Sequence, residues 1–138
     1  MDEATLALSI RLRHPTMNVR DISRGMEFVP VVAHQVGDVK TNRAGQALGG
    51  RYAESYWVCR PIDTESIGLA TAIAMANQWM SARAVFVTSF GESGGAAEYY
   101  LTAYCTGLFG FELDPQLLHQ CAALRVKLAV EVISASDE

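Results

Sequence analysis

The sequence has little positive charge, few cysteines and no apolar run long enough to cross a membrane. It contains 11 lysine and arginine residues against 15 acidic residues, which gives a net charge of -4. Because phosphate neutralisation requires a basic surface, this balance argues against nucleic-acid binding. The longest apolar stretch, Ile67–Met80, contains Thr71, Asn77 and Gln78. It falls short of the roughly 18 apolar residues that span a bilayer, so it predicts a buried helix and no membrane contact.

Cysteines show no pattern typical of a disulfide framework or a zinc site. The three of them, Cys59, Cys105 and Cys121, cannot all pair with one another, and no two have a C-x-x-C spacing. Free cysteines are among the most buried residue types, and disulfides are rare in the cytoplasm. We therefore expect buried, reduced thiols and a cytoplasmic protein.

Signatures of metal and cofactor binding are missing as well. The three histidines are far apart and lack the H-x-x-x-H spacing of a metal site. Gly49-Gly50 precedes a predicted strand, whereas phosphate loops and dinucleotide fingerprints place glycines between a strand and a helix. The acidic start M-D-E-A-T also differs from the basic start of a signal peptide. We expect no metal, no cofactor and no nucleic-acid partner.

The chain does contain enough apolar sequence for one packed domain. Of its 138 residues, 50% are hydrophobic and 19% are charged, which is the composition of an ordinary globular protein. We predict a single domain over residues 1–138 with a tail from about residue 134 to 138.

The clearest element is Glu98–Thr106, which reads E-Y-Y-L-T-A-Y-C-T. Its odd-numbered residues fall on one side of an extended chain, and its even-numbered residues, which include Tyr100 and Tyr104, fall on the other. Aromatic and β-branched residues in a period of two predict a strand with one buried and one wet face. Leu6–Arg13 and Arg125–Ile133 alternate in the same way and predict two more strands.

Two other segments predict less regular strands. Phe28–His34 is expected to be a short strand at a sheet edge, because Pro30 cannot donate to a ladder. Arg51–Arg60 is expected to be a strand with mixed faces, whose register is weakly specified.

Between these strands, Gly37–Gly50 has no hydrophobic pattern and contains four glycines, which predicts a surface loop. Loops of this length are uncommon in compact domains and are often functional. A mobile connection is the more common role of such a segment; for the functional alternative, the candidate binding residues are Asp38 and Arg43 of this loop, with Trp57 of the following strand.

Three helices are indicated by their first residues. Asn18 predicts the N-cap of a helix that runs to about Gly25, Thr64 predicts the cap of a second helix, and Asp114-Pro115 predicts the start of a third. The second helix carries an apolar stripe and is expected to be the main covering helix. The stripe consists of Leu69, Ile73, Ala76 and Met80, widened by Ala72, Met75 and Trp79.

The segment Arg83–Gly95 fits two structures. Its core, A-V-F-V-T-S-F, favours a strand by propensity, whereas the spacing of Phe86 and Phe90 and the glycines at 94 and 95 fit a helix with its C-cap. The order of the elements predicts an α+β fold in either case. We expect two layers, a largely antiparallel mixed sheet with helices packed on one face.

Two segments carry a family resemblance. The C-terminal third reads Y-Y-L-T-A-Y-C-T-G-L-F-G-F-E-L-D-P-Q-L-L-H-Q-C-A-A-L-R-V-K-L-A-V-E-V-I, and the N-terminal segment reads S-I-R-L-R-H-P-T-M-N-V-R-D-I-S-R-G-M-E-F-V-P. In these segments, and at Gly37-Asp38 and the strand around Trp57, the chain resembles the bacterial DUF4279 family. The resemblance implies a helix at Ser81–Glu92 and implies no activity, because the function of that family is unknown. The glycine-rich loop and the apolar helix at 69–80 depart from its pattern.

One pattern suggests catalysis. Residues 91–95, G-E-S-G-G, form a G-x-S-x-G motif around Ser93, and Asp114 and His119 follow later in the chain. In hydrolases this serine lies between a strand and a following helix. Here a strand follows, and Asp114 serves better as a helix cap. A small hydrolase at Ser93 is thus a less favoured alternative, and we assign no catalytic residue.

The alternating strands suggest a binding surface. If their apolar sides face the helices, their other sides form an open sheet face, whose candidate binding residues are Arg11, Arg13, Tyr100, Thr102 and Tyr104. Tyrosine and arginine are enriched at interfaces, although threonine and tyrosine also simply favour strands. We predict a non-enzymatic binding module that uses this face to form a homodimer or to bind another protein. Single-stranded RNA is the alternative ligand, because aromatic and arginine side chains on open sheets stack bases.

Overall fold

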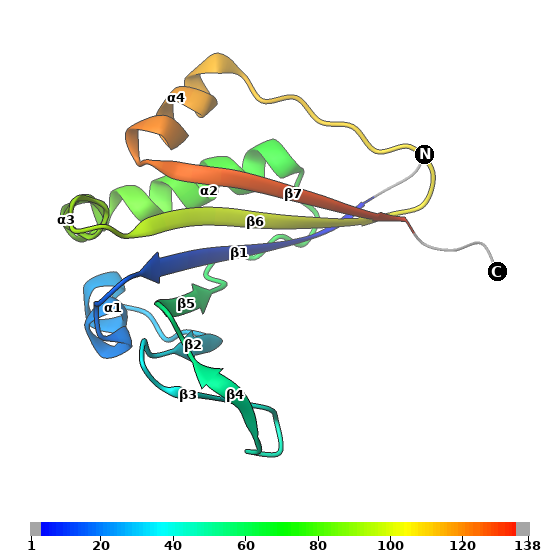
Figure 1. Cartoon of the computed structure of the whole chain (residues 1–138). Coiled ribbons are helices and arrows are strands. Elements are labelled where there is room, and N and C mark those ends of the chain that lie inside the picture. The colour runs from blue at the N-terminus through cyan, green and yellow to red at the C-terminus, as the bar shows by residue number, and fades with distance from the viewer. Residues whose placement is uncertain (1–3, 135–138) are drawn as a thin grey trace.

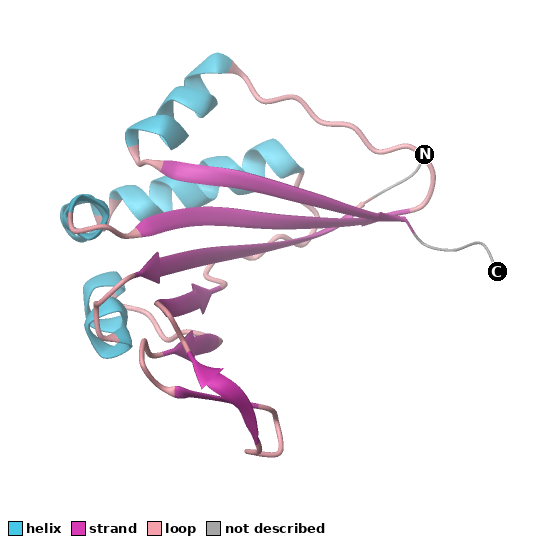
Figure 2. Cartoon of the chain, in the orientation of Figure 1, coloured by secondary structure: helices cyan, strands magenta, loops and turns pink. Residues whose placement is uncertain are grey.

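The computed structural model describes residues 4–134, which form a five-stranded mixed sheet, a separate two-stranded sheet and four helices (Figures 1 and 2). The α+β class is therefore as predicted. In chain order the elements are β1 Thr5–His14, α1 Val19–Met26, β2 Val32–His34, β3 Val39–Thr41, β4 Ala47–Arg51, β5 Ser55–Cys59, α2 Leu69–Ser81, α3 Ala84–Glu92, β6 Ala96–Cys105, α4 Pro115–Ala123 and β7 Val126–Ser134.

The strand β1 lies at the centre of the large sheet, whose order is β2-β5-β1-β6-β7. It pairs antiparallel with β5 on one side and with β6 on the other. β7 joins β6 in parallel after the crossover through α4, as a parallel pair requires. The sheet is thus largely antiparallel with one parallel pair, which confirms the predicted mixed arrangement.

One face of this sheet packs against the helices. The alternating residues Ile10 and Leu101 are fully buried, in the same apolar cluster as Ile22 of α1, Ile73 of α2 and Phe90 of α3. Figure 1 shows α2 running behind β6 and β7, on the side away from the viewer. The helices therefore share one side of the sheet, as the alternation in β1 and β6 predicts.

The apolar stripe on α2 is buried as predicted, but of the three residues expected to widen it only Ala72 is buried. Leu69, Ile73, Ala76 and Met80 are each at most 3% exposed, and Ala72 is also buried. Two of the widening residues differ: Met75 is 39% exposed and Trp79 is half-buried. A helix buries only the arc that faces the sheet, and these two side chains lie outside it.

The apolar side of β7 is covered only at its start. Val126 is 8% exposed, whereas Val130 is 36% and Val132 is 49% exposed. The cause is the length of α4, because a nine-residue helix spans about 13 Å and a nine-residue strand about 30 Å. The expectation that the whole alternating face of this strand is buried is therefore wrong for its second half.

Two of the three predicted helix starts are confirmed. The side chain of Asn18 accepts a hydrogen bond from the Arg20 N–H, and that of Asp114 accepts one from Leu117 N–H at 2.8 Å. The cap at Thr64 is wrong, because α2 begins only at Leu69. The Thr64 hydroxyl instead donates to the Leu6 carbonyl at 2.6 Å and so ties the preceding loop to β1.

The ambiguous segment is the helix α3, against its strand propensity and in line with the family resemblance. Val87 and Phe90 are buried in the core between the helix and the sheet. The helix ends where the Gly95 N–H donates to the Phe90 carbonyl at 2.9 Å, with Gly94 at a positive φ of 107°. The glycine pair thus acts as the C-cap that the sequence indicates.

The predicted loop at Gly37–Gly50 is wrong, because most of it folds as the hairpin β3–β4. The Asn42 side chain closes the turn by accepting hydrogen bonds from the N–H groups of Ala44 and Gln46, both at 2.9 Å. All residues of the hairpin are exposed. Without a buried side there is no hydrophobic alternation, and the strands were invisible to a pattern-based prediction.

The two edges of the large sheet differ in length. At one edge, β2 has only three residues, so the predicted strand at Phe28–His34 is shorter than expected, although its edge position is confirmed. At the other edge, β7 has nine residues, and no strand within residues 4–134 pairs with its outer side. Among these described residues, no helix is long and apolar enough to cross a bilayer.

Candidate functional site

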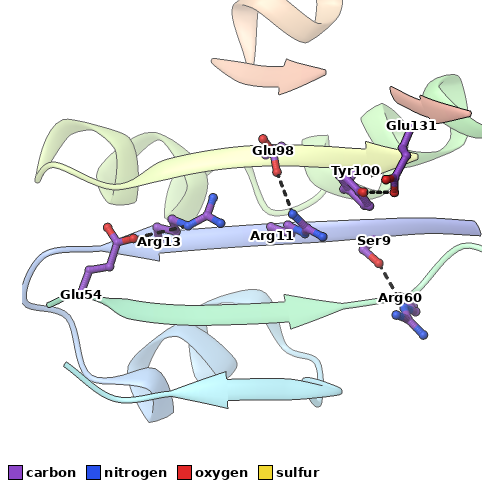
Figure 3. A network of polar contacts seen from close by, with 8 residues as sticks. All are labelled: Ser9, Arg11, Arg13, Glu54, Arg60, Glu98, Tyr100 and Glu131. Atoms are coloured by element: carbon purple, nitrogen blue, oxygen red, sulfur yellow. Dashed lines mark hydrogen bonds and ion pairs between the residues drawn. The ribbon is translucent and has the colours of Figure 1, made fainter. Parts of the chain in front are cut away.

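The sheet has a second face, opposite the helices, which we call the open face. Figure 3 shows the polar contacts on this side, where residues of β1, β6 and β7 meet the two residues that flank β5, Glu54 and Arg60. The register places each of these strands so that their outward residues form cross-strand rows. The outward residues are Thr5, Ala7, Ser9, Arg11, Arg13, Val32, His34, Tyr56, Val58, Ala96, Glu98, Tyr100, Thr102, Tyr104, Lys127, Ala129, Glu131 and Ile133.

Arg11 is the centre of the first cluster on the open face. Its guanidinium lies 3.7 Å from the centroid of the Tyr100 ring, and it forms an ion pair with Glu98, its neighbour in the register, at 3.6 Å. The Tyr100 hydroxyl donates to Glu131 of β7 (Figure 3). This hydrogen bond to a carboxylate raises the pKa of Tyr100. The cluster therefore holds an arginine and a tyrosine in fixed positions across three strands.

A second cluster lies where the hairpin meets the open face. The Tyr56 ring has Arg13 over one side at 4.9 Å, and the His34 ring is stacked parallel to it at 6.2 Å. Tyr52 stacks on His34 at 4.4 Å, and Lys40 lies 5.8 Å from the Tyr52 ring. Arg13 also pairs with Glu54 at 3.4 Å. These side chains line a pocket of about 320 Å³, which we call the hairpin pocket.

Long side chains cover the small residues of the open face. Ser9, Val58 and Thr102 are only 7%, 4% and 7% exposed although they point away from the helices. The Arg60 Nε–H, for example, donates to the Ser9 hydroxyl at 3.1 Å. Arginine and tyrosine side chains often lie along a surface in this way, with the charged or hydroxyl end in water.

The structure brings most of the predicted binding residues together. Arg11 and Tyr100 are in direct contact, and Arg13 lies two residues along the same strand. Tyr104 is 49% exposed at the far end of the face, whereas Thr102 is nearly buried. The prediction from alternation is thus right for the position of these side chains, but Thr102 offers little surface to a partner.

The other three candidates are separated from this cluster. Asp38 and Arg43 are exposed in and beside the hairpin, outside the lining of the hairpin pocket. Trp57 is fully buried on the helix side, where its indole N–H donates to the Ser23 hydroxyl at 2.9 Å. It belongs to the core, because it alternates with Tyr56, which takes the outward position.

Sequence reasoning found Arg13 but missed the other residues of the hairpin pocket and the acidic partners of the arginines. Tyr56 could have been found from the alternation in Ser55–Cys59, whose odd-numbered residues are buried. Tyr52, His34 and Glu54 could not, because their position depends on the pairing of β2 with β5 and on the hairpin. No pattern along the chain reports that pairing.

Ser93 lies beside His14, not beside His119. Its hydroxyl is 2.9 Å from His14 Nε2, while His14 Nδ1 accepts the N–H groups of Thr16 at 3.1 Å and Met17 at 2.9 Å. Because Nδ1 accepts hydrogen bonds from two N–H groups, the proton of a neutral ring is on Nε2, and Nε2–H donates a hydrogen bond to the serine hydroxyl. A catalytic base requires the opposite polarity, with Nε2 free to take the serine proton. This geometry favours a structural role for the pair.

The buried polar groups between the sheet and the helices are hydrogen-bonded to one another. The Tyr99 hydroxyl donates to the Asn77 side-chain oxygen at 2.8 Å, and the Asn77 amide lies 3.4 Å from the Cys121 sulfur. All three cysteines are free and buried, as expected. Within residues 4–134, no group of three histidine, cysteine or acidic side chains is placed to hold a metal ion.

Comparison of the chain with protein-family models, with curated proteins and with solved structures finds no match. The resemblance to the DUF4279 family therefore stays a prediction. The argument for function rests on the geometry of the open face.

Proposed function

We propose that this protein is a non-enzymatic binding module whose open face docks a protein partner. The observation that carries the proposal is the pairing of arginines with tyrosines on the side of the sheet without helices: Arg11 on Tyr100 and Arg13 on Tyr56. Arginine and tyrosine are the residues most often found at the energetic centres of protein interfaces. Their stacked, ion-paired side chains are already ordered, which lowers the entropy lost on binding.

The hairpin pocket adds an anchor point at one end of the open face. It is concave, about 320 Å³ in volume, and combines the rings of Tyr52 and Tyr56 with the cations Arg13 and Lys40. A partner side chain that carries an aromatic ring would find ring faces and cations to stack on there. We propose that the partner inserts such a side chain into the pocket while its main contact covers the Arg11 cluster.

Charge on the open face favours protein over RNA as the ligand. The cations Arg11 and Arg13 are paired with Glu98 and Glu54, and Glu131 adds a further carboxylate. A strand of RNA needs free cations for its phosphates and free ring faces for its bases. Here the rings carry guanidinium groups of the protein itself, and the nearby carboxylates repel phosphate.

The test is site-specific photo-crosslinking in cells that naturally produce the protein. A benzophenone amino acid replaces Tyr104, which is 49% exposed on the open face, and in a control it replaces Val85, which is 89% exposed on α3. We expect one adduct of defined mass from position 104 and none from position 85. Adding Tyr100→Ala should lower the adduct yield more than about fivefold, the effect of losing one interface hot spot.

The mass of the adduct identifies the class of partner. A product of twice the chain mass means that a second copy lies near Tyr104, which neighbours Ile133 of β7, and a product sensitive to ribonuclease means RNA. Equal adducts from positions 104 and 85, or no adduct at 104, would contradict the proposal. Circular dichroism of the Tyr100→Ala variant checks that the fold is retained, as expected for a residue outside the core cluster.

A further inference from the structure

The strand β7 forms an edge of the sheet that differs from the other edge in length and character. Figure 1 shows it as the outermost strand of the sheet. Its outer side pairs with no strand within residues 4–134, and Val130, Val132 and Ile133 are 36%, 49% and 40% exposed. A long apolar edge strand is a template for pairing with another chain, and proteins usually protect such edges with charges, proline or a covering element.

The sequence of β7 is complementary to itself in the antiparallel direction. If two copies pair around Ala129, Lys127 of each copy faces Glu131 of the other on the open face. On the helix side, Val126 faces Val132 and Leu128 faces Val130, so every apolar residue meets an apolar residue. Opposite charges and branched apolar pairs directly across an antiparallel ladder stabilise the pairing.

Other registers lose this complementarity. When the two sheets join into one with both helix layers on the same side, odd-numbered residues of one copy face odd-numbered residues of the other, and even-numbered residues face even-numbered ones. The two-fold axis therefore passes through a residue and not between two residues. An axis at Lys127 or at Glu131 sets like charges against each other. An axis at Leu128 sets Lys127 against Ala129 and Glu131 against Arg125, which precedes the strand. An axis at Val130 sets Lys127 against Ile133 and Glu131 against Ala129. The axis at Ala129 alone pairs Lys127 with Glu131.

We infer that two copies of this chain associate through an antiparallel β7–β7 contact centred on Ala129, which joins the two sheets into one. Both charged residues are available for it. Lys127 is exposed and forms no ion pair among the described residues. The Tyr100 hydroxyl occupies only one oxygen of Glu131. The contact uses the edge rather than the open face, so it does not depend on the proposed function.

Neighbouring elements allow the added strand. α4 packs against α2, which runs behind the sheet in Figure 1, and against β7. The exposed side chains of Val130 and Val132 lie where α4 no longer covers the strand. A second copy of β7 would bury these side chains against its own Leu128 and Val126.

The experiment is a charge-reversal cycle read out by mass. Sedimentation over a concentration series should give a dimer for the wild-type chain. Lys127→Glu and Glu131→Lys should each raise the dissociation constant by about tenfold or more, because each variant sets two like-charged pairs against each other. An equimolar mixture of the two variants should restore dimers that contain one copy of each, and the double variant Lys127→Glu with Glu131→Lys should dimerise like the wild type.

The restored mixture separates the inference from simple damage to the fold. A misfolded variant is not rescued by a second misfolded variant, whereas opposite charges across the ladder are. Val85→Lys, at an exposed position on α3, is the control and should leave the dimer unchanged. A wild-type chain that stays monomeric throughout the series, or a mixture that binds no better than the single variants, would overturn the inference. Neither result bears on crosslinking at position 104.

Discussion

The side chains that look most reactive in this protein are used to hold the chain in place. His14 lies at the end of β1, receives two backbone N–H groups on one ring nitrogen and donates from the other to Ser93. The Ser93 hydroxyl in turn donates to the Phe90 carbonyl at 3.1 Å. This chain of hydrogen bonds links the turn after β1 to the end of α3, two segments that are 79 residues apart in the sequence.

Replacing Ser93 tests this structural role. Ser93→Ala removes the acceptor of the buried His14 Nε2–H, and we expect the free energy of unfolding to fall by about 1–2 kcal/mol, the usual cost of an unsatisfied buried group. Urea denaturation measures the change, and Ser89→Ala, at an exposed position of α3, is the matched control. We also expect no labelling of wild-type Ser93 by a fluorophosphonate. Labelling at this serine would instead support the hydrolase hypothesis.

The candidate site was predictable where one strand carries the signal and not where two strands must meet. Alternation in β1 and β6 places Arg11, Arg13 and Tyr100 on one side before any pairing is known. The contact of Arg11 with Glu98 depends on the register of β1 against β6, and the hairpin pocket depends on three separate segments. These contacts depend on how the strands pair, and strand pairing produces no periodic pattern in the sequence.

Helices and strands were likewise predictable only where the pattern lies within one segment of the sequence. The strands β1 and β6 and the helix α2 were predictable because each has one buried side, which imposes a period of 2 or 3.6 on the sequence. The hairpin β3–β4 has no buried side and is held by the Asn42 turn, so its sequence looks like a loop. Thr64 has the chemistry of a helix cap, but its hydroxyl is taken by a carbonyl of β1.

The contact between α1 and α3 depends on the absence of a side chain at Gly25. A Cβ at this position would lie 2.1 Å from one ring carbon of Phe86 and 2.5 Å from its Cγ, far inside van der Waals contact. We expect Gly25→Ala to lower the free energy of unfolding by about 1–3 kcal/mol, because the ring and the helix must move apart. Gly110→Ala, where no atom lies within 4 Å of the added Cβ, should be nearly neutral.

A double-mutant cycle assigns the cost of this substitution to the helix contact. Phe86→Ala removes the ring that the new Cβ meets. The loss in the variant with both changes should therefore be smaller than the sum of the two single losses by about 1 kcal/mol or more. Additive losses in urea denaturation would show that Gly25→Ala acts through the backbone of α1 and not through Phe86.

Two buried titratable groups make the free energy of unfolding depend on pH. Burial raises the pKa of the Cys59 thiol to about 12, with the nearby Arg83 charge opposing the shift in part, and burial also raises the pKa of Tyr99. In the unfolded chain the thiol ionises near pH 9. Between these values the unfolded state has lost a proton that the folded state keeps, so rising pH favours unfolding. The stabilisation is complete below about pH 9.

We expect the free energy of unfolding to fall from about pH 9 toward pH 12, by at most about 1.4 kcal/mol per pH unit for each group. Cys59→Ala should lower stability at pH 8 because it leaves a cavity, but it should also flatten the fall at higher pH. Urea midpoints at half-unit intervals from pH 8 to pH 11 measure both slopes. Parallel curves for the two proteins would mean that Cys59 does not contribute to the pH dependence.

The unequal margins of the sheet limit how large an assembly this protein can build. One margin is long and bare, whereas the other, β2, offers only three residues. A ladder of three residues is too short to hold a neighbour, so growth through it is blocked. If the long margin is occupied as we infer, the remaining margin of the large sheet within residues 4–134 is this short strand, so pairing through the sheet stops at two copies.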